Sequence, residues 1–404
     1  MTKPHSTLPV LGFGNGSKNL FPPESLEDTR QMIENLCTDI KFASKIEECE
    51  KFSGGNNIAI AFTCLPLKAK DKNQRIACVL RTAIRNYFTN NPPTNAHLKS
   101  VVAITQNLRE KLGSPIPGTL AWDCTYENPI RSPYTILERL MGETLEYEYR
   151  KLGKGLEYKT PRNPHLERRC KYAKCVAGFV AALDKTSFPG YGVFVSHVNM
   201  ANKGTSENAT LQISRAAING IRIPSEPFFD KWVENVLNAQ MQKTMDIYNV
   251  SANEKFKIQK LGKIGVEMSQ KGLFLDEPAV VWHLDFYPRN IMIKSTRNNA
   301  MLTGVIDWDD AKAVPRIMAR RPPNFLWNMP ENPLLLEEKA AIAAAFDREM
   351  ERLRPGYVQD AYLKNRVMVR ALCMYAFFGV NHEYCYELSF NDLVSQWEEF
   401  MRKV

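Results

Sequence analysis

The feature that most constrains this chain is a polar loop that runs directly into an apolar segment at residues 283–293, HLDFYPRNIMI. A histidine, an aspartate, an arginine and an asparagine fall within its first eight residues, and Ile291, Met292 and Ile293 follow at once. A short apolar run rich in β-branched residues favours a buried strand. The stretch is therefore either a solvated turn that leads into a strand or a catalytic loop that the strand holds in place.

A second acidic segment, GVIDWDDA, follows the loop and places Asp307 at the end of the β-type run Leu302–Ile306. An aspartate such as Asp285 can orient a substrate hydroxyl and take its proton, and the amide oxygen of Asn290, five residues later, can bind Mg²⁺. Carboxylates such as that of Asp307 are also ligands that Mg²⁺ prefers. The pattern predicts phosphoryl transfer, although Asp285 and Asp307 could also be solvated residues at two strand ends.

The composition narrows the class of protein. The chain has 404 residues, 44% of them hydrophobic, and a net charge of +9. Its Lys and Arg residues are spread along the whole length without interleaved aromatics, which argues against nucleic-acid binding, whereas a positive field suits nucleotides. No apolar run approaches eighteen residues and the start lacks the order of a signal peptide, so we expect no membrane association. Nine scattered cysteines predict reduced thiols in a cytoplasmic protein.

The pattern of apolar residues changes along the chain. Residues 1–24 predict a flexible arm, and residues 25–52 have the apolar spacing of a helix with Ser25 as its N-cap. Two β-type runs, IAIAFTCLPL and RIACVLRTAI, predict a hairpin, and a helix is expected over about 97–112. Beyond Gly142 the pattern is mostly helical, with a loop-rich stretch at 186–226. We expect an α+β fold with an N-terminal lobe at 25–142 and a C-terminal lobe at 143–404.

The loop and the strand-end segment together resemble the catalytic loop and metal-binding segment of the aminoglycoside phosphotransferase family, which has a bilobal protein-kinase-like fold. SPYTILERLMG, SPIPGTLAWD and the segment 315–327 are similar to a branch of that family found in fungi. The resemblance covers residues 50 to about 330. It implies a small β-rich lobe that binds nucleotide and a larger, mostly helical lobe that carries the catalytic loop and the substrate site.

The resemblance also implies roles for individual residues. Asp285 matches the catalytic aspartate, Asn290 and Asp307 match magnesium ligands, and His283 matches a histidine that braces the metal-binding segment. Arg81 stands where the family has a lysine, or sometimes an arginine, that contacts the phosphates of the nucleotide. The remaining nucleotide contacts come from a turn between the first two strands and from the interlobe hinge Glu138–Met141, and the residues assigned to them are Ser53, Gly54, Gly55, Asn56, Asn57, Glu138 and Leu140.

Several assignments leave alternatives open. The glycines at 12–16, GFGNG, compete with residues 53–57 as the phosphate turn, but no strand follows them. Asp309 and Asp310 could hold a metal or a cationic substrate, or could simply be solvated. Arg289 could pair with a nearby carboxylate, and Tyr287 could contact substrate or anchor the turn. Weak candidates for an acceptor pocket are Glu383, Tyr384 and Tyr386.

The expected function is transfer of the γ-phosphate of ATP, with Mg²⁺, to a hydroxyl of a small molecule. One departure from the family supports a different hypothesis, a pseudokinase that only binds nucleotide or acts as a scaffold. The kinase helix that usually supplies a glutamate partner for the third-strand cation has no acidic residue in TNAHLKSVVAITQ. Modification of a protein or transfer of AMP is a third possibility. The sequence specifies neither the acceptor nor the oligomeric state.

Overall fold

The computed structural model describes residues 25–53, 57–67, 74–83, 95–153, 165–196, 211–214, 217–218, 221–222, 229–246, 251–275, 277–296, 299–329, 334–380 and 387–403. By internal contacts the chain divides into two compact units. The first comprises residues 1–95, 119–139 and 200–206, and the second comprises the rest. Residues 96–118, which hold most of the helix that we expected in the N-terminal lobe, group with the second unit.

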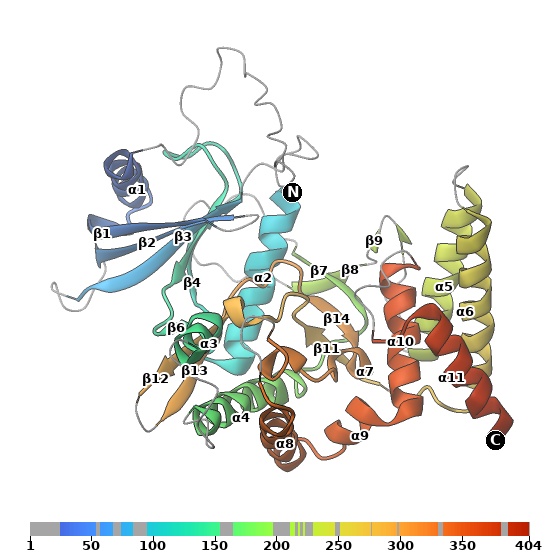
Figure 1. Ribbon diagram of the computed structural model, residues 1–404. Helices are drawn as coiled ribbons and strands as arrows, with labels where there is room; N and C mark the ends of the chain where they lie inside the picture. Colours follow the sequence, from blue (N-terminus) through green and yellow to red (C-terminus); the bar gives the residue numbers. More distant parts are fainter. Residues whose placement is uncertain are drawn as a thin grey trace, which may run out of the picture. The chain divides into compact units, whose positions relative to one another are not determined.

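Over its described residues, the first unit is a single antiparallel sheet covered by one helix (Figure 1). The strand order is β1-β2-β3-β5-β4, and the hairpin predicted for the second and third strands is confirmed. Ile33, Leu36 and Cys37 of the helix pack against the apolar side chains of the sheet to form a core. The elements are α1 (Leu26–Asp39), β1 (Ala43–Ser53), β2 (Asn57–Pro66), β3 (Ile76–Ala83), β4 (Thr119–Asp123) and β5 (Tyr134–Glu138).

The helix predicted over residues 25–52 is wrong in its second half. Ser25 does cap α1, and its side chain accepts a hydrogen bond from the backbone N–H of Asp28 at 3.3 Å. The helix ends at Asp39, however, and β1 follows. Register shifts between Ala43 and Lys45 and between Glu47 and Cys49 interrupt the two-residue repeat of β1. Because a bulge inserts an extra residue, the apolar side chains recur every three residues and imitate a helix.

In the second unit, the described residues form helices and three smaller sheets (Figure 1). Strands β13, β12 and β6 form one sheet, β11, β14, β7 and β8 form another, and β10 pairs with β9. The stretch 186–226, expected to be loop-rich, thus contributes four short strands. The strands are β6 (Glu143–Thr144), β7 (Gly192–Ser196), β8 (Leu211–Ser214), β9 (Ala217–Ile218), β10 (Ile221–Arg222), β11 (Ala279–Trp282), β12 (Ile291–Ser295), β13 (Ala300–Val305) and β14 (Lys312–Pro315).

Helices make up most of the rest of this unit. They are α2 (Asn95–Leu112), α3 (Leu145–Gly153), α4 (Leu166–Leu183), α5 (Phe229–Asp246), α6 (Ala252–Gln270), α7 (Arg316–Ala319), α8 (Leu336–Leu353), α9 (Tyr357–Tyr362), α10 (Lys364–Phe378) and α11 (Phe390–Lys403), with short 3-10 turns η1 (Pro288–Asn290) and η2 (Asn324–Leu326). The expected α+β class, with a β-rich N-terminal part and a mostly helical C-terminal part, is confirmed. Among the described helices, none is long and apolar enough to span a membrane.

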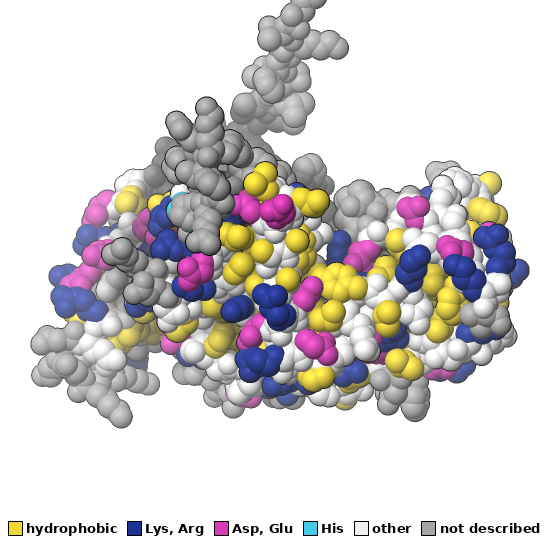
Figure 2. Space-filling model, turned by 60° about the horizontal axis from the view of Figure 1, so that its bottom comes forward, with side chains coloured by type: hydrophobic (Ala, Val, Ile, Leu, Met, Phe, Trp, Pro, Cys, Tyr) yellow, Lys and Arg dark blue, Asp and Glu magenta, His cyan; other side chains and the backbone are white. Residues whose placement is uncertain are grey.

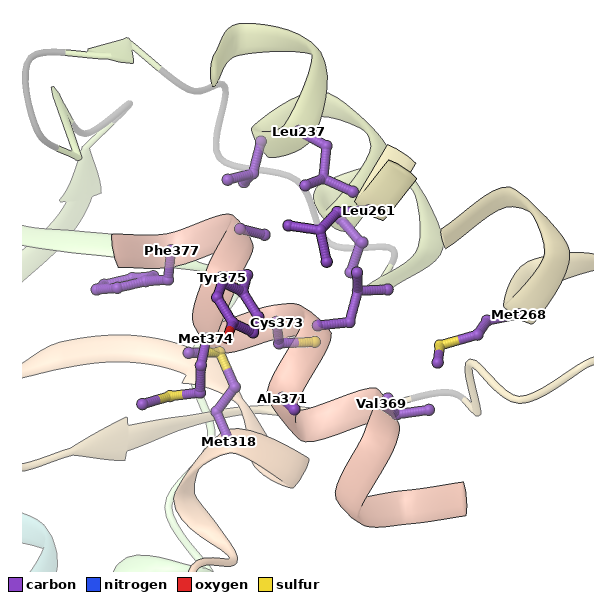
Figure 3. Close-up of a cluster of buried hydrophobic side chains, with 14 of the residues drawn as sticks. Leu237, Leu261, Met268, Met318, Val369, Ala371, Cys373, Met374, Tyr375 and Phe377 are labelled. Carbon is purple, nitrogen blue, oxygen red and sulfur yellow. The ribbon is translucent and has the colours of Figure 1, made fainter. Parts of the chain in front are cut away.

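Two apolar clusters form the core of the second unit. One surrounds α10, whose buried face meets α5, α6 and α7, and Figure 3 shows Leu237, Leu261 and Met318 directed toward Tyr375 and Met374. The other joins α3, α4 and α8 to the strands that flank the polar loop, including Val281, Ile291 and Val305. Val281 before the loop and Ile291 and Ile293 after it are therefore buried, which fixes the two ends of the loop. Every cysteine in the described ranges is a free thiol.

Candidate active site

The polar loop at 283–290 joins β11 to β12 through the 3-10 turn η1. The backbone N–H of Tyr287 donates to Asp285 O at 2.9 Å, and that of Asn290 donates to Tyr287 O at 2.9 Å. Pro288 opens η1, where its fixed backbone angle suits a helical first residue. These bonds fold the loop back on itself, so that Asp285 and Asn290 face each other.

The side chain of Asp285 is held on both carboxylate oxygens. Asn290 Nδ2 donates to Asp285 Oδ2 at 2.7 Å and to Asp285 O at 2.9 Å, while the guanidinium of Arg289 binds Asp285 Oδ1. The Asp285 side chain remains 32% exposed. Because Asn290 uses its amide nitrogen for both bonds, its amide oxygen is the atom it can offer to a cation.

His283 connects the loop to the strand that precedes Asp307. The histidine is buried, and its Nε2 lies 2.9 Å from the carbonyl oxygen of Ile306. A carbonyl oxygen only accepts, so Nε2 carries the proton and donates. Burial lowers the pKa of His283, which favours the neutral imidazole. Its ring also packs edge-on against buried Trp308, with ring centroids 4.5 Å apart.

Asp307 follows the end of β13 in a left-handed backbone conformation, with φ of +70°. The residues before it are fixed by hydrogen bonds, because Ile306 N–H donates to Asn290 O and Val305 N–H donates to Pro115 O, each at 2.9 Å. A left-handed conformation is uncommon outside glycine and costs about 1–3 kcal/mol, so the surrounding bonds must hold it. The backbone of Asn290 is thus hydrogen-bonded to Ile306, the residue directly before Asp307.

The oxygen donors of Asn290 and Asp307 fit Mg²⁺ by their chemistry. Mg²⁺ is usually bound by one or two carboxylates and completes its shell with water and substrate phosphates. Over the described part of the chain, no group of three or more His, Cys, Asp or Glu side chains could hold a metal. A magnesium site here would therefore depend on the nucleotide for its remaining ligands.

The acidic residues after Asp307 have different surroundings. Asp309 is half-buried, and its Oδ2 lies 4.0 Å from Nε2 of His97 on α2. Asp310 is exposed. Helix α2 contains no acidic residue in its first turn, and Glu110 in its last turn is exposed. This helix therefore contacts the segment after Asp307 through a histidine.

The predicted hinge residue Leu140 packs against β13, the strand that ends shortly before Asp307. A side chain at Gly304 of β13 would collide with Leu140 and would lie 2.7 Å from Pro115 O. The hydroxyl of Thr303 donates to Met141 O at 2.5 Å. Leu140 and Met141 are therefore in direct contact with the strand that ends before Asp307.

The other predicted nucleotide residues lie in the first unit. Arg81, on the central strand β3, pairs with Ala59 of β2 and Thr135 of β5, and Glu138 pairs with Cys78. Ser53 ends β1 and Asn57 begins β2. Gly54, Gly55 and Asn56 lie outside the described residues, as do residues 12–16 and 381–386. That these residues and the polar loop of the second unit form one nucleotide site stays a prediction.

Sequence reasoning named Arg289 only as a partner of some carboxylate, and the structure identifies Asp285 as that carboxylate. The four-residue spacing between them was the available signal. The guanidinium also lies over the ring of Tyr287, 5.0 Å from its centroid. The contact of His97 with Asp309, in contrast, joins residues that are 212 positions apart, and no local pattern points to it.

Comparison with known proteins bears on this segment. The model of a family described as the phosphotransferase enzyme family matches residues 222–318. Solved structures similar to this chain include aminoglycoside phosphotransferase APH(4)-Ia, with 14% identity, a TM-score of 0.46, and coverage of 92% of this chain and 98% of that one. An ethanolamine kinase of Plasmodium vivax has 14% identity, a TM-score of 0.41, and coverage of 94% and 91%. No curated protein sequence matches the chain.

Structural likeness with TM-scores below 0.5 establishes neither a substrate nor a site for this chain. The family match is different in kind, because it lies in the sequence itself and includes His283, Asp285, Asn290 and Asp307. The fungal branch stays a prediction. The resemblance to the phosphotransferase enzyme family, predicted from the loop and the strand-end aspartate, is confirmed over residues 222–318.

Proposed function

We propose that the chain is an ATP-dependent phosphotransferase that moves the γ-phosphate to a hydroxyl of a small molecule. The observation that carries this proposal is the hydrogen-bonded unit around Asp285. Asn290 fixes the Asp285 carboxylate, Ile306 N–H binds Asn290 O, and His283 binds Ile306 O. The base, the amide and the backbone directly before the strand-end carboxylate are thus joined by hydrogen bonds, a fixed arrangement that suits phosphoryl transfer.

In this mechanism Asp285 orients the acceptor hydroxyl and takes its proton. Asn290 and Asp307 would hold Mg²⁺, and a bound Mg²⁺ supplies charge neutralisation at the phosphates. Arg81 would contact the phosphates, since an arginine keeps its charge and binds phosphate oxygens in a fork. Residues 53–57, Glu138 and Leu140 would contact the rest of the nucleotide.

The test compares Asp285→Asn and Asp307→Asn with Asp230→Asn, a change of the same type at an exposed position of α5. Both site variants should lose ATP consumption by more than a hundredfold while the control keeps the wild-type rate. Equal Tm values, measured by thermal unfolding without nucleotide, would show that the loss is not due to unfolding. Wild-type turnover in either site variant would rule out the mechanism.

A nucleotide-binding pseudokinase is the second candidate. The observation in its favour is the absence of acidic residues from the first turn of α2, since the family resemblance implies a glutamate on the corresponding helix. A thermal shift with Mg²⁺ and ATP, combined with an assay of ADP release, separates the two. At 100 times its dissociation constant, ATP should stabilise a binding-competent protein by about 2.7 kcal/mol. A shift without ADP release in any acceptor screen would favour the pseudokinase.

A further inference from the structure

A pocket of about 140 Å³ lies beside the loop that holds Asp285. Leu284 and Phe286, the two neighbours of Asp285 in the chain, both line it. The pocket is also lined by Ala319, the last residue of α7, by residues 321–325 that follow it, and by Val180 and Leu183 at the end of α4. The pocket therefore belongs entirely to the second unit.

Aromatic rings form much of the wall. Phe286 and Phe325 meet edge to face with centroids 6.0 Å apart, and Tyr287 lies 6.2 Å from Phe325. Trp282 also lines the pocket, and Pro322 and Pro323 add rigid apolar surface. Aromatic walls of this kind bind planar or apolar rings through dispersion and edge-to-face contacts.

The charges that face the pocket are largely compensated. Asp184 is its one carboxylate among the described lining residues, and this side chain is 3% exposed and bonded to Arg320 at 2.8 Å and Arg354 at 2.6 Å. His283 is buried, and its Nε2 donates to Ile306 O. The remaining charged lining residue is Arg321, whose guanidinium is 4.0 Å from Glu387. The carboxylate of Asp184 is therefore already paired with arginine and is not available to bind a cationic ligand.

Tyr287 connects the pocket to the reacting group. Its exposed ring lines the pocket and lies under the guanidinium of Arg289, which binds Asp285 Oδ1. Tyr287 N–H also donates to Asp285 O at 2.9 Å. A compound seated against Tyr287 thus lies next to the Tyr287–Arg289 pair, and Arg289 holds the carboxylate that would take its proton.

We propose that this pocket binds the phosphoryl acceptor through a single benzene-sized ring, and that the acceptor is a neutral or anionic hydroxyl compound. An apolar cavity of about 150 Å³ takes up benzene, so the volume suits one ring and not a chain of sugars. The inference rests on the proposed function. In the reaction the acceptor oxygen bonds to the γ-phosphorus, the bond from that phosphorus to the bridging oxygen breaks, the hydroxyl proton passes to Asp285, and ADP leaves.

Three matched probes test the class of acceptor. They are benzyl alcohol, 4-(hydroxymethyl)benzoate and 4-(hydroxymethyl)benzylamine, which share a ring and a hydroxyl and differ in charge. We expect the neutral and anionic probes to raise the Tm and to stimulate ADP release, and the cationic probe to bind at least tenfold more weakly. Tighter binding of the amine than of the other two would overturn the charge assignment.

Two variants locate the binding site. Ala319→Phe fills the pocket and should abolish the effect of benzyl alcohol, whereas Ala340→Phe, the same change at an exposed position of α8, should leave it intact. Phe325→Leu removes one ring from the wall and should weaken benzyl alcohol binding severalfold even if Ala319→Phe folds poorly. Unchanged binding in the Phe325 variant would overturn the location.

The thermal shift with Mg²⁺ and ATP is measured in parallel, so that two failures can be told apart. A wild-type protein that responds to ATP but to none of the ring probes would overturn the pocket and leave the phosphotransferase standing. A protein that binds benzyl alcohol in the Phe325-dependent manner but never binds ATP would contradict the proposed function, and with it the assignment of this ring as an acceptor.

Discussion

The imidazole Nε2 of His283 donates a 2.9 Å hydrogen bond to the carbonyl oxygen of Ile306, the residue directly before Asp307. This bond joins the first residue of the polar loop to the end of a strand 23 positions later. Ile306 N–H in turn donates to Asn290 O, at the other end of the loop. Ile306 is therefore held from both ends of the loop, and the position of Asp307 depends on both bonds.

We predict that His283→Ala lowers both activity and stability. The change leaves Ile306 O without its donor at a site where His283 itself is 3% exposed, and an unsatisfied buried acceptor costs about 1–3 kcal/mol. Urea denaturation should show this loss in the free energy of unfolding. The kcat should fall with the misplacement of Asp307, and His165→Ala, at the start of α4, should preserve it.

The same histidine should make stability depend on pH. Burial lowers the pKa of His283, so between that value and about 6.5 the unfolded chain binds a proton that the folded chain does not. The free energy of unfolding therefore rises with pH across this window, by at most about 1.4 kcal/mol per pH unit. This contribution of His283 to stability is lost as the pH falls. The free energy of unfolding, measured by denaturation at several pH values, should rise less steeply with pH for His283→Ala than for the wild type.

The local parts of the site could be predicted from the sequence, and the long-range parts could not. The loop before β12 and the strand before Asp307 follow from short-range patterns, because buried strands leave apolar runs. Strand β1 was misread as helix because register shifts alter its two-residue repeat. The wall of the pocket at Phe325 and the contact of His97 with Asp309 depend on tertiary packing between distant segments, which periodicity does not encode.

The distribution of charged side chains over the surface also depends on tertiary structure and does not follow from the sequence pattern. A net charge of +9 could indicate a nucleic-acid surface, but its meaning depends on where the side chains gather. Figure 2 shows Lys and Arg side chains dispersed among acidic and apolar ones on the visible face, without a continuous basic stripe. Part of the arginine complement is buried in the second unit instead, where Arg320, Arg366 and Arg370 pair with acidic residues.

Arg289 should affect catalysis through Asp285. Its guanidinium holds Asp285 Oδ1, so Arg289→Ala frees the carboxylate to adopt other rotamers. We expect kcat to fall by about tenfold to a hundredfold with little change in the KM for ATP, and Arg289→Lys to restore part of the rate because a lysine is a point charge without the fork. Steady-state kinetics with a fixed acceptor measures both parameters, and an equal loss in an exposed control such as Arg352→Ala would contradict the role.

The buried ion network should be a major contributor to stability. Asp360 accepts from Arg320 at 2.6 Å and from Arg366 at 2.7 Å, and both arginines are less than a tenth exposed. Asp360→Ala would leave two buried cations short of a partner and should cost about 3–5 kcal/mol. The exposed pair of Lys403 and Glu399 is the control, since Glu399→Ala removes a solvent-screened ion pair and should cost far less. Chemical denaturation of both variants measures the difference, and similar losses would show that burial does not matter here.

Gly142 provides a test of the backbone next to the predicted hinge. It adopts φ of +99°, and a Cβ there would lie 2.7 Å from the carbonyl carbon of Ile293 in β12. Gly142→Ala should therefore strain the pairing of β6 with β12 and cost more than about 1 kcal/mol. Gly178 in the middle of α4 meets nothing within 4 Å, so Gly178→Ala should instead stabilise by about 0.5–1 kcal/mol. Opposite signs in the measured free energies of unfolding would support this account, and a neutral Gly142→Ala would show that β6 can shift away from β12 without loss.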